Sequence, residues 1–271
     1  MNNKRCPITG DTNAKLFFSY DKPPDGEVDY KLNNSGNYKR EIWQYAPSGH
    51  FISNHSMDVN KLYKGQYVDS TYKDLSSMQK IFNKIISLPS NKSDNFGRFN
   101  SLLEFSHRWF NINFKPNLLD IGSGLGVFPY IVEKNGWECT AIDPDNRSIQ
   151  LINQNTNVKT ICGDFMELKS KKKYDIITLN KVLEHVDDPI KMLSKSREWL
   201  NKDGFIYLEL PDGEMACLEG KGREEFFIEH LNIFSMTSTS ILVSKAGFKL
   251  NKLLRLKEPS SKYTIRAFLS F

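Results

Sequence analysis

A glycine-rich turn after a short apolar run constrains this chain more than any other feature. Residues 118–128 read LLDIGSGLGVF: the run ends in Asp120, and Gly122, Gly124 and Gly126 follow at alternate positions before an apolar, helix-compatible segment. This order predicts a strand, a tight turn and a helix start, which bring backbone N–H groups against a ligand with no Cβ in the way. The spacing is GxGxG, whereas the dinucleotide fingerprint GxGxxG has its third glycine one place later.

Further strand-like segments follow this turn at regular intervals. They span residues 137–142, 158–161, 174–179 and 204–210, with helix-like segments at 145–155 and 189–200. The alternation indicates a parallel sheet with helices on both faces. Ligands of such sheets bind beyond the carboxyl ends of the strands. Asp143, Asp164 and Asn180 all stand at such ends.

Two of these polar residues suit a nucleoside. Asp143 lies roughly 20 residues after the glycine turn, and its carboxylate, which only accepts hydrogen bonds, matches two ribose hydroxyls. Asp164 can accept from an adenine amino group, and Phe165 can pack on the ring. Ordinary alternatives stay open: Asp143 as the cap of a helix that starts near Pro144, and Asp164 as a turn residue after Gly163.

The ordered set of motifs resembles a known family. DIGSGLGVF, AIDPD, GDF and LNKVLEHVDDP resemble the successive motifs of class I S-adenosylmethionine-dependent methyltransferases over roughly residues 98–271. LELPDGE, GREEFFIEHLNIFS and KAGF resemble, more narrowly, a bacterial branch associated with sugar, polysaccharide and small-molecule tailoring. The resemblance implies S-adenosyl-L-methionine as cofactor and S-adenosyl-L-homocysteine as product. The residues that it implies in cofactor binding are Asp120, Gly122, Ser123, Gly124, Gly126, Asp143, Pro144, Asp164, Phe165, Asn180 and Arg98.

The resemblance also implies a fold and a division of labour. The fold is α/β, a Rossmann-like mixed sheet of seven strands with helices on both faces, and its last two strands are expected at 248–254 and 263–270. The glycines would line the methionine end of the cofactor. Asp143 would hold the ribose and Asp164 the adenine, Asn180 would sit below the sulfonium, and Arg98 would reach the cofactor carboxylate.

Histidines supply the candidate bases. The donor methyl is already activated, so the protein must align the acceptor and, for a hydroxyl, help to remove its proton. His230 follows the fifth strand among acidic neighbours and is the first candidate, and His185, after the fourth strand, is the second, although a structural role for it stays open. Glu184, Glu209 or alignment alone would serve otherwise. A histidine base predicts a pH dependence at about 6 to 7.

The function expected from the sequence is therefore O-methylation of a small-molecule hydroxyl, such as that of a sugar or sugar nucleotide destined for a surface glycan. N- or C-methylation of a small metabolite is the second possibility. The third is a scaffold protein that binds S-adenosylmethionine without catalysis. Nucleic acid is not expected as a partner, because residues 180–183 read NKVL rather than the Asn/Asp-Pro-Pro-aromatic motif and the net charge is only +5. Neither the acceptor nor the oligomeric state follows from the sequence.

The composition fits one large domain with an appendage. The 271 residues are 39% hydrophobic, which allows a sizeable core. We expect a methyltransferase domain at 98–271 and an irregular or helical N-terminal lobe at 1–97, with lid helices over 72–88 and 98–110. Tyr63, Tyr67 and Tyr72 precede these helices and suit the site and interdomain packing equally.

No metal is expected from the sequence. Cys6 opens a CPxCG-like knuckle, but Thr9 takes the place of its second cysteine and no later CxxC completes a site, so the lobe is at most a metal-free remnant. Asp187 and Asp188 precede Pro189 and are expected to cap a helix.

The location expected from the sequence is cytoplasmic. No apolar stretch approaches the roughly 20 residues of a membrane span. The N-terminus has no basic-then-apolar signal segment. The four scattered cysteines fit a reducing compartment.

Overall fold

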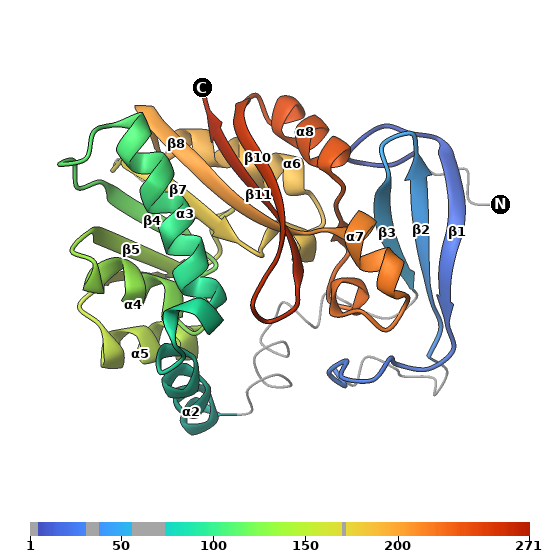
Figure 1. Ribbon diagram of the computed structural model, residues 1–271, viewed down its shortest axis with the longest axis horizontal. Helices are drawn as coiled ribbons and strands as arrows, with labels where there is room; N and C mark the ends of the chain where they lie inside the picture. Colours follow the sequence, from blue (N-terminus) through green and yellow to red (C-terminus); the bar gives the residue numbers. More distant parts are fainter. Residues whose placement is uncertain (1–4, 31–37, 56–73, 170–171) are drawn as a thin grey trace.

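The computed structural model describes residues 5–30, 38–55, 74–169 and 172–271, which form a large and a small β-sheet with helices (Figure 1). Tyr63, Tyr67 and Tyr72 lie outside these residues. In chain order the elements are β1 (Asn13–Tyr20), β2 (Arg40–Ala46), β3 (His50–His55), α2 (Leu75–Ile86), α3 (Asp94–Trp109), β4 (Asn117–Ile121), α4 (Val127–Lys134), β5 (Glu138–Asp143), α5 (Asn146–Asn155), β6 (Lys159–Cys162), β7 (Tyr174–Asn180), α6 (Pro189–Lys195), β8 (Leu200–Pro211), α7 (Gly213–Ala216), β9 (Asn232–Ile233), α8 (Met236–Lys245), β10 (Lys249–Lys257) and β11 (Tyr263–Ser270).

The large sheet has seven strands in the order β10-β11-β8-β7-β4-β5-β6. Strands β4 to β8 run parallel, and β11 is antiparallel to both β8 and β10. The expected mixed α/β sheet of seven strands, with its antiparallel finish, is confirmed. The carboxyl ends of the parallel strands therefore meet at one edge, where the expected polar residues stand.

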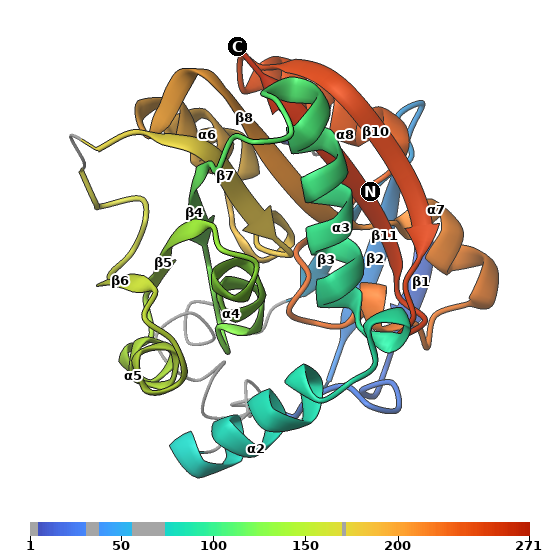
Figure 2. The ribbon, with the colours of Figure 1, turned by 60° about the vertical axis from the view of Figure 1, so that its left-hand side comes forward.

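Helices cover both faces of this sheet, as Figures 1 and 2 show. Because successive strand residues point to opposite faces, an unbroken apolar run can serve two cores at once. In β7, Ile176 packs into the core under α3, α4 and α5, whereas Ile177 packs into the core under α6 and α8. For this reason the strand-like segments of the sequence are buried on both faces of the sheet.

The small sheet corrects the expectation of an irregular N-terminal lobe. Strands β1, β2 and β3 form a regular antiparallel sheet at one end of the large one (Figure 1), and β9 completes it in the order β1-β2-β3-β9. Phe51 pairs with Ile233 and Ile52 with Asn232. The lobe thus takes a strand from the segment after β8. The boundary proposed at residues 97 and 98 falls inside α3.

His50 of β3 lies where the small sheet meets α8. Its Nδ1 is 3.2 Å from Ser238 Oγ and its Nε2 is 3.4 Å from Asn232 Oδ1, and its ring packs 5.1 Å from that of Phe234. The side chain is fully buried. Burial lowers the pKa of His50 to about 4, so the folded protein holds it neutral. No helix in the described part of the chain is long and apolar enough to cross a membrane.

We expect His50 to make the protein lose stability as the pH falls from 6.5 towards 4. The unfolded chain takes up the proton at the higher pH, so the loss for this one group reaches about 3 kcal/mol at pH 4. Urea unfolding at pH 7 and pH 4.5 measures the change, which should shrink in His50→Gln and persist in the control His107→Gln. An equal pH dependence in wild type and His50→Gln would contradict the prediction.

Candidate active site

The glycine turn joins β4 to α4, and two of its glycines differ in how much space surrounds them. Gly126, at φ 74°, precedes α4, and a Cβ there would overlap Ile152 of α5. Gly124, at φ 52°, has no atom of the described residues within 4 Å of the position that a Cβ would take. Gly126 therefore lets two helices pack closely, whereas Gly124 leaves an accessible backbone surface at the sheet edge.

Asp143 ties this turn to the end of β5. Its Oδ2 accepts from the Gly124 N–H at 2.8 Å and its Oδ1 from the Asp145 N–H at 2.9 Å. The capping alternative for Asp143 is wrong, because the cap of α5 is Asp145, whose carboxylate accepts from Arg147 N. Pro144 is exposed between them. Burial raises the pKa of Asp143 to about 6, against the lowering effect of its backbone partners.

Asp120 and Asn180 form a second polar pair at the ends of β4 and β7. Asp120 Oδ1 accepts from Asn180 Nδ2 at 2.8 Å and from Thr178 Oγ1 at 2.6 Å. Ser123 Oγ donates to the Asp120 carbonyl at 3.0 Å. Asn180 Oδ1 is buried and accepts no hydrogen bond from any described residue. An unpaired buried acceptor is unfavourable by about 1–3 kcal/mol, so this oxygen suits a ligand that donates.

Arg98 belongs to a buried ion-pair network. Its Nη2 donates to Glu209 Oε2 at 2.5 Å, its Nη1 donates to Asn95 at 2.7 Å, and Arg266 Nε lies 3.0 Å from Glu209 Oε1. Burial alone would raise the pKa of Glu209, but Arg98 and Arg266 hold it at about 2. Glu209 is therefore paired with two guanidinium groups, which disfavours it as a base. The Arg98 Nε is buried without a hydrogen bond among the described residues.

The adenine-side residues separate. Asp164 is exposed after β6, where its Oδ1 accepts from Met166 N at 2.8 Å, as a turn residue does. Phe165 is buried with its ring 5.5 Å from that of Trp199. The expectation that Phe165 packs on adenine is wrong, because its ring is part of the core beneath the sheet.

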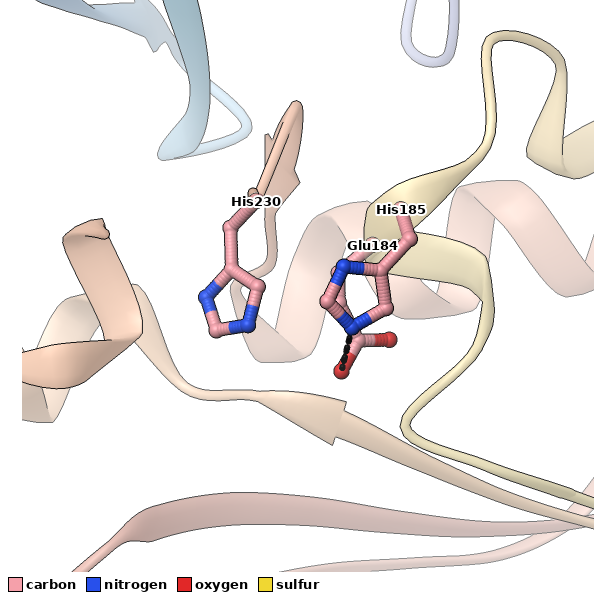
Figure 3. A group of neighbouring side chains, drawn as sticks. All are labelled: Glu184, His185 and His230. Atoms are coloured by element: carbon pink, nitrogen blue, oxygen red, sulfur yellow. Dashed lines mark ion pairs between the residues drawn. The ribbon is translucent and has the colours of Figure 1, made fainter. Parts of the chain in front are cut away.

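His185 and His230 lie against each other, as Figure 3 shows. Their ring centroids are 4.9 Å apart, and Glu184 Oε1 lies 3.9 Å from His185 Nε2. His185 Nδ1 lies 2.9 Å from the Glu229 carbonyl, and His230 Nδ1 lies 2.9 Å from the Glu225 carbonyl. A carbonyl only accepts, so each Nδ1 carries the hydrogen and each Nε2 carries the lone pair.

Backbone pairing brings these histidines together across 45 residues of sequence. The Leu231 N–H donates to the Glu184 carbonyl at 2.8 Å, and the Asn232 side chain donates to the Val186 carbonyl at 3.1 Å. On its other side, the Leu231 carbonyl accepts from Ser53 N of β3. The 3₁₀ turn over residues 183–185 and the segment before β9 are thus fixed to each other and to the small sheet.

A cavity of about 170 Å³ opens at this cluster. Its walls are almost entirely ionisable: Lys181, Glu184, His185, Pro211, Glu224, Glu225, Glu229, His230 and Lys262. The sequence interpretation missed Lys181 and Lys262. Lys181 directly follows Asn180 at φ 58°, a strained backbone angle that is common at functional sites and costs about 1–3 kcal/mol. The position of Lys181 directly after Asn180 could have indicated that it lies at the site. Lys262 comes from the turn between β10 and β11, and its place in the sequence gave no such indication.

Burial changes the expected acid–base behaviour. It lowers the pKa of His185 to about 4, and burial together with neighbouring His185 lowers the pKa of His230 well below 6.5. Burial also raises the pKa of Glu184 to about 8. The expected pH dependence at about 6 to 7 is therefore corrected: both imidazoles are neutral at that pH and hold their lone pairs ready.

Comparison with known proteins gives a consistent family. A family model described as "Methyltransferase domain" matches residues 88–253. A ubiquinone biosynthesis O-methyltransferase of Actinobacillus pleuropneumoniae serotype 7 (strain AP76) is 25% identical over 116 residues, which are 39% of this chain and 50% of that protein. One of Coxiella burnetii (strain Dugway 5J108-111) is 29% identical over 97 residues, 34% of this chain and 42% of that protein. The chain thus spans about half the length of the curated relatives that it matches, or less.

Solved structures share the fold. A magnesium protoporphyrin IX methyltransferase from Synechocystis PCC 6803, with bound S-adenosylhomocysteine, is 14% identical with a TM-score of 0.58, over 78% of this chain and 99% of that one. A putative O-methyltransferase from Nostoc punctiforme PCC 73102 is 16% identical with a TM-score of 0.53, over 72% of this chain and 59% of that one.

We expect Gly126→Ala to destabilise the protein much more than Gly124→Ala. Both place a side chain at positive φ, which costs about 1–2 kcal/mol. Only the Gly126 variant also overlaps Ile152, for about 1–3 kcal/mol more. Denaturant unfolding of both variants measures the difference, and equal stabilities would contradict the geometry of the turn.

Proposed function

The chain belongs to the methyltransferase domain family, and on that premise we propose that it transfers the methyl group of S-adenosyl-L-methionine to a hydroxyl of a small polar molecule. One observation carries the proposal: His185 and His230 are two neutral imidazoles in the wall of one cavity, and the Nε2 of each carries a lone pair. Lys181, the residue after Asn180, lines the same cavity. Two Nε2 atoms that can accept a proton in this cavity suit the removal of a proton from a bound hydroxyl.

The residues at the sheet edge fit the proposed cofactor. Gly124 leaves room for a ligand to approach the backbone closely, and Asp143 offers carboxylate oxygens for ribose hydroxyls. Asn180 Oδ1 can accept a hydrogen bond from the cofactor. Asp120 would orient Asn180, and Arg98 Nε would face the cofactor carboxylate. When bound, the cofactor supplies a methyl group already activated by its sulfonium.

The cluster would prepare the acceptor. An Nε2 lone pair accepts a hydrogen bond from the substrate hydroxyl and orients its oxygen, and the Nδ1–H bonds to backbone carbonyls keep each ring in the tautomer that this needs. His230, on the segment held by the small sheet, is the first candidate for receiving the proton, and His185 is the second. Glu184 lies beside His185 and would stabilise positive charge there.

The lining of the cavity favours a polyhydroxylated acceptor over an apolar one. Its wall contains Lys and Glu side chains beside both histidines, and among the described residues that line it only Pro211 lacks an ionisable side chain. Hydroxyl groups both donate and accept, so a sugar or sugar nucleotide can satisfy such walls. Such an acceptor fits a proposed role in making a surface glycan, which we place in the cytoplasm. Methylation of an amine on a small metabolite is the alternative.

We expect the purified chain to bind S-adenosyl-L-homocysteine at micromolar Kd, about −8 kcal/mol. Gly124→Val should block binding by filling the open space at the turn. Asp143→Ala should weaken it about tenfold to a hundredfold through loss of charged hydrogen bonds. Calorimetry measures both, with the exposed Asp187→Ala as control. Unchanged binding in Gly124→Val, or none in wild type, would remove the basis of the proposal.

We expect alanine at the true base, His230 or His185, to lower kcat by about 10² to 10⁴ while cofactor affinity stays nearly unchanged. Release of S-adenosyl-L-homocysteine across a panel of nucleotide sugars and precursor alcohols measures kcat, with His107→Ala as control. Because burial lowers the pKa of His185 to about 4, wild-type kcat should hold from pH 7.5 to pH 6 and fall only towards pH 4. Near wild-type kcat in both variants would exclude a histidine base.

A further inference from the structure

We propose that Glu184, His185 and His230 form a binding site for a divalent first-row transition metal ion, with Zn²⁺ as the reference ion. Each contributes one ligand atom, and these three atoms all lie within 4.8 Å of one another (Figure 3). Ligands of a tetrahedral ion with bonds of about 2.0–2.2 Å stand about 3.3–3.6 Å apart. Small rotations of the side chains into the cavity of about 170 Å³ close that difference.

The histidines already have the outer hydrogen bonds that metal ligands need. A metal-binding imidazole usually donates its second N–H to a carbonyl or carboxylate, which fixes the tautomer and the ring plane. His185 Nδ1 and His230 Nδ1 both do so, to the Glu229 and Glu225 carbonyls. Two neutral rings thus present Nε2 lone pairs to one cavity from two separate segments.

Glu184 supplies the independent argument. Its carboxyl group is fully buried, and neither oxygen makes a hydrogen bond with any described residue. A buried carboxylate without partners is strongly unfavourable unless it is neutralised or binds a cation. A bound metal ion would satisfy both of these oxygens.

The surrounding charges permit a cation. Glu225 pairs with Arg223 at 2.8 Å and Lys262 with Glu224 at 3.3 Å, so these groups largely cancel. Lys181 is held away from full exposure by its hydrogen bond to Thr264 Oγ1, which it donates at 3.2 Å. Glu229 also lines the cavity and adds negative charge when ionised.

Two imidazoles and one carboxylate indicate the type of ion. This mixed donor set suits Zn²⁺, Mn²⁺ or Fe²⁺, whereas Mg²⁺ and Ca²⁺ prefer oxygen ligands. Three protein ligands leave an open position, as in catalytic rather than structural zinc sites. The expectation of no metal concerned Cys6 and the pair Asp187 and Asp188, of which Asp188 caps α6. The present site uses a different set of residues.

The role of the ion rests on the proposed function. An acceptor hydroxyl in the open position would lose its proton to solvent near neutral pH, because a bound metal lowers the pKa of a coordinated hydroxyl. Its oxygen lone pair then forms the new O–CH₃ bond while the S–CH₃ bond breaks and its electron pair returns to sulfur. In the metal-bound protein the histidines would hold the ion, whereas in the metal-free protein they would take the proton as proposed above.

Calorimetric titration of the untagged full chain with Zn²⁺, after removal of metal by a chelator and dialysis, tests the site. We expect one equivalent of Zn²⁺ to bind and to raise the unfolding temperature. Glu184→Gln, His185→Ala and His230→Ala should each weaken binding at least about tenfold. His107→Ala, on α3, is the matched control and should bind as wild type does. Co²⁺ in place of Zn²⁺ should give visible d–d absorption that is lost in the same three variants.

The outcomes separate the two proposals. No stoichiometric binding and no change in unfolding temperature for the wild type would overturn the metal site, even if every variant failed to fold. Binding that survives in all three variants would overturn it too. Methyl transfer at full rate by the metal-free protein would defeat the metal's role and leave the proposed function standing. Metal binding without turnover on any acceptor would contradict the proposed function and leave the metal site standing.

Discussion

The hydrogen bond from Leu231 N to the Glu184 carbonyl is the interaction on which the candidate site depends. It fixes the turn after β7 to the segment before β9, and the Ser53 N–H bond to the Leu231 carbonyl fixes that segment to the small sheet. With both backbones held, the Glu229 and Glu225 carbonyls are in place to accept from the two imidazoles. The N-terminal strands therefore support the cluster from outside, since β3 pairs with β9 and completes the sheet that holds it.

Two buried carboxylates near this edge show how surroundings decide the state of the same chemical group. Glu209 is held ionised by Arg98 and Arg266, and breaking such a buried pair costs about 3–5 kcal/mol because one charge is left alone. Glu184 has no arginine partner among the described residues, and burial raises its pKa to about 8. The first arrangement stabilises the junction of α3 with β8 and β11. The second arrangement leaves the Glu184 carboxyl group in the cavity wall, where it can interact with a ligand.

The sequence predicted the large sheet well and the small one poorly. Apolar runs of strand length that alternate with helical segments leave few topologies open, so β4 to β8 and the final β10–β11 pair lie where the pattern put them. The N-terminal lobe was expected to be irregular or helical, yet it contains β1, β2 and β3, and its fourth strand, β9, is only two residues long and comes from residues 232–233. Local patterns cannot reveal such a pairing, because its stability comes from strands nearly two hundred residues away.

The sequence by itself determined which residues stand at the carboxyl ends of the strands, because strand period and glycine spacing are local properties of the chain. Gly124, Asp143 and Asn180 were found on that basis, as were both histidines. Only the tertiary structure decided what each does there. It turned Phe165 into the core, committed the terminal nitrogens of Arg98 to internal partners, and brought His185 within 4.9 Å of His230. It also lowered the imidazole pKa values through burial. Burial, tautomer and pKa depend on what the rest of the chain packs around a side chain, and no local spacing encodes that.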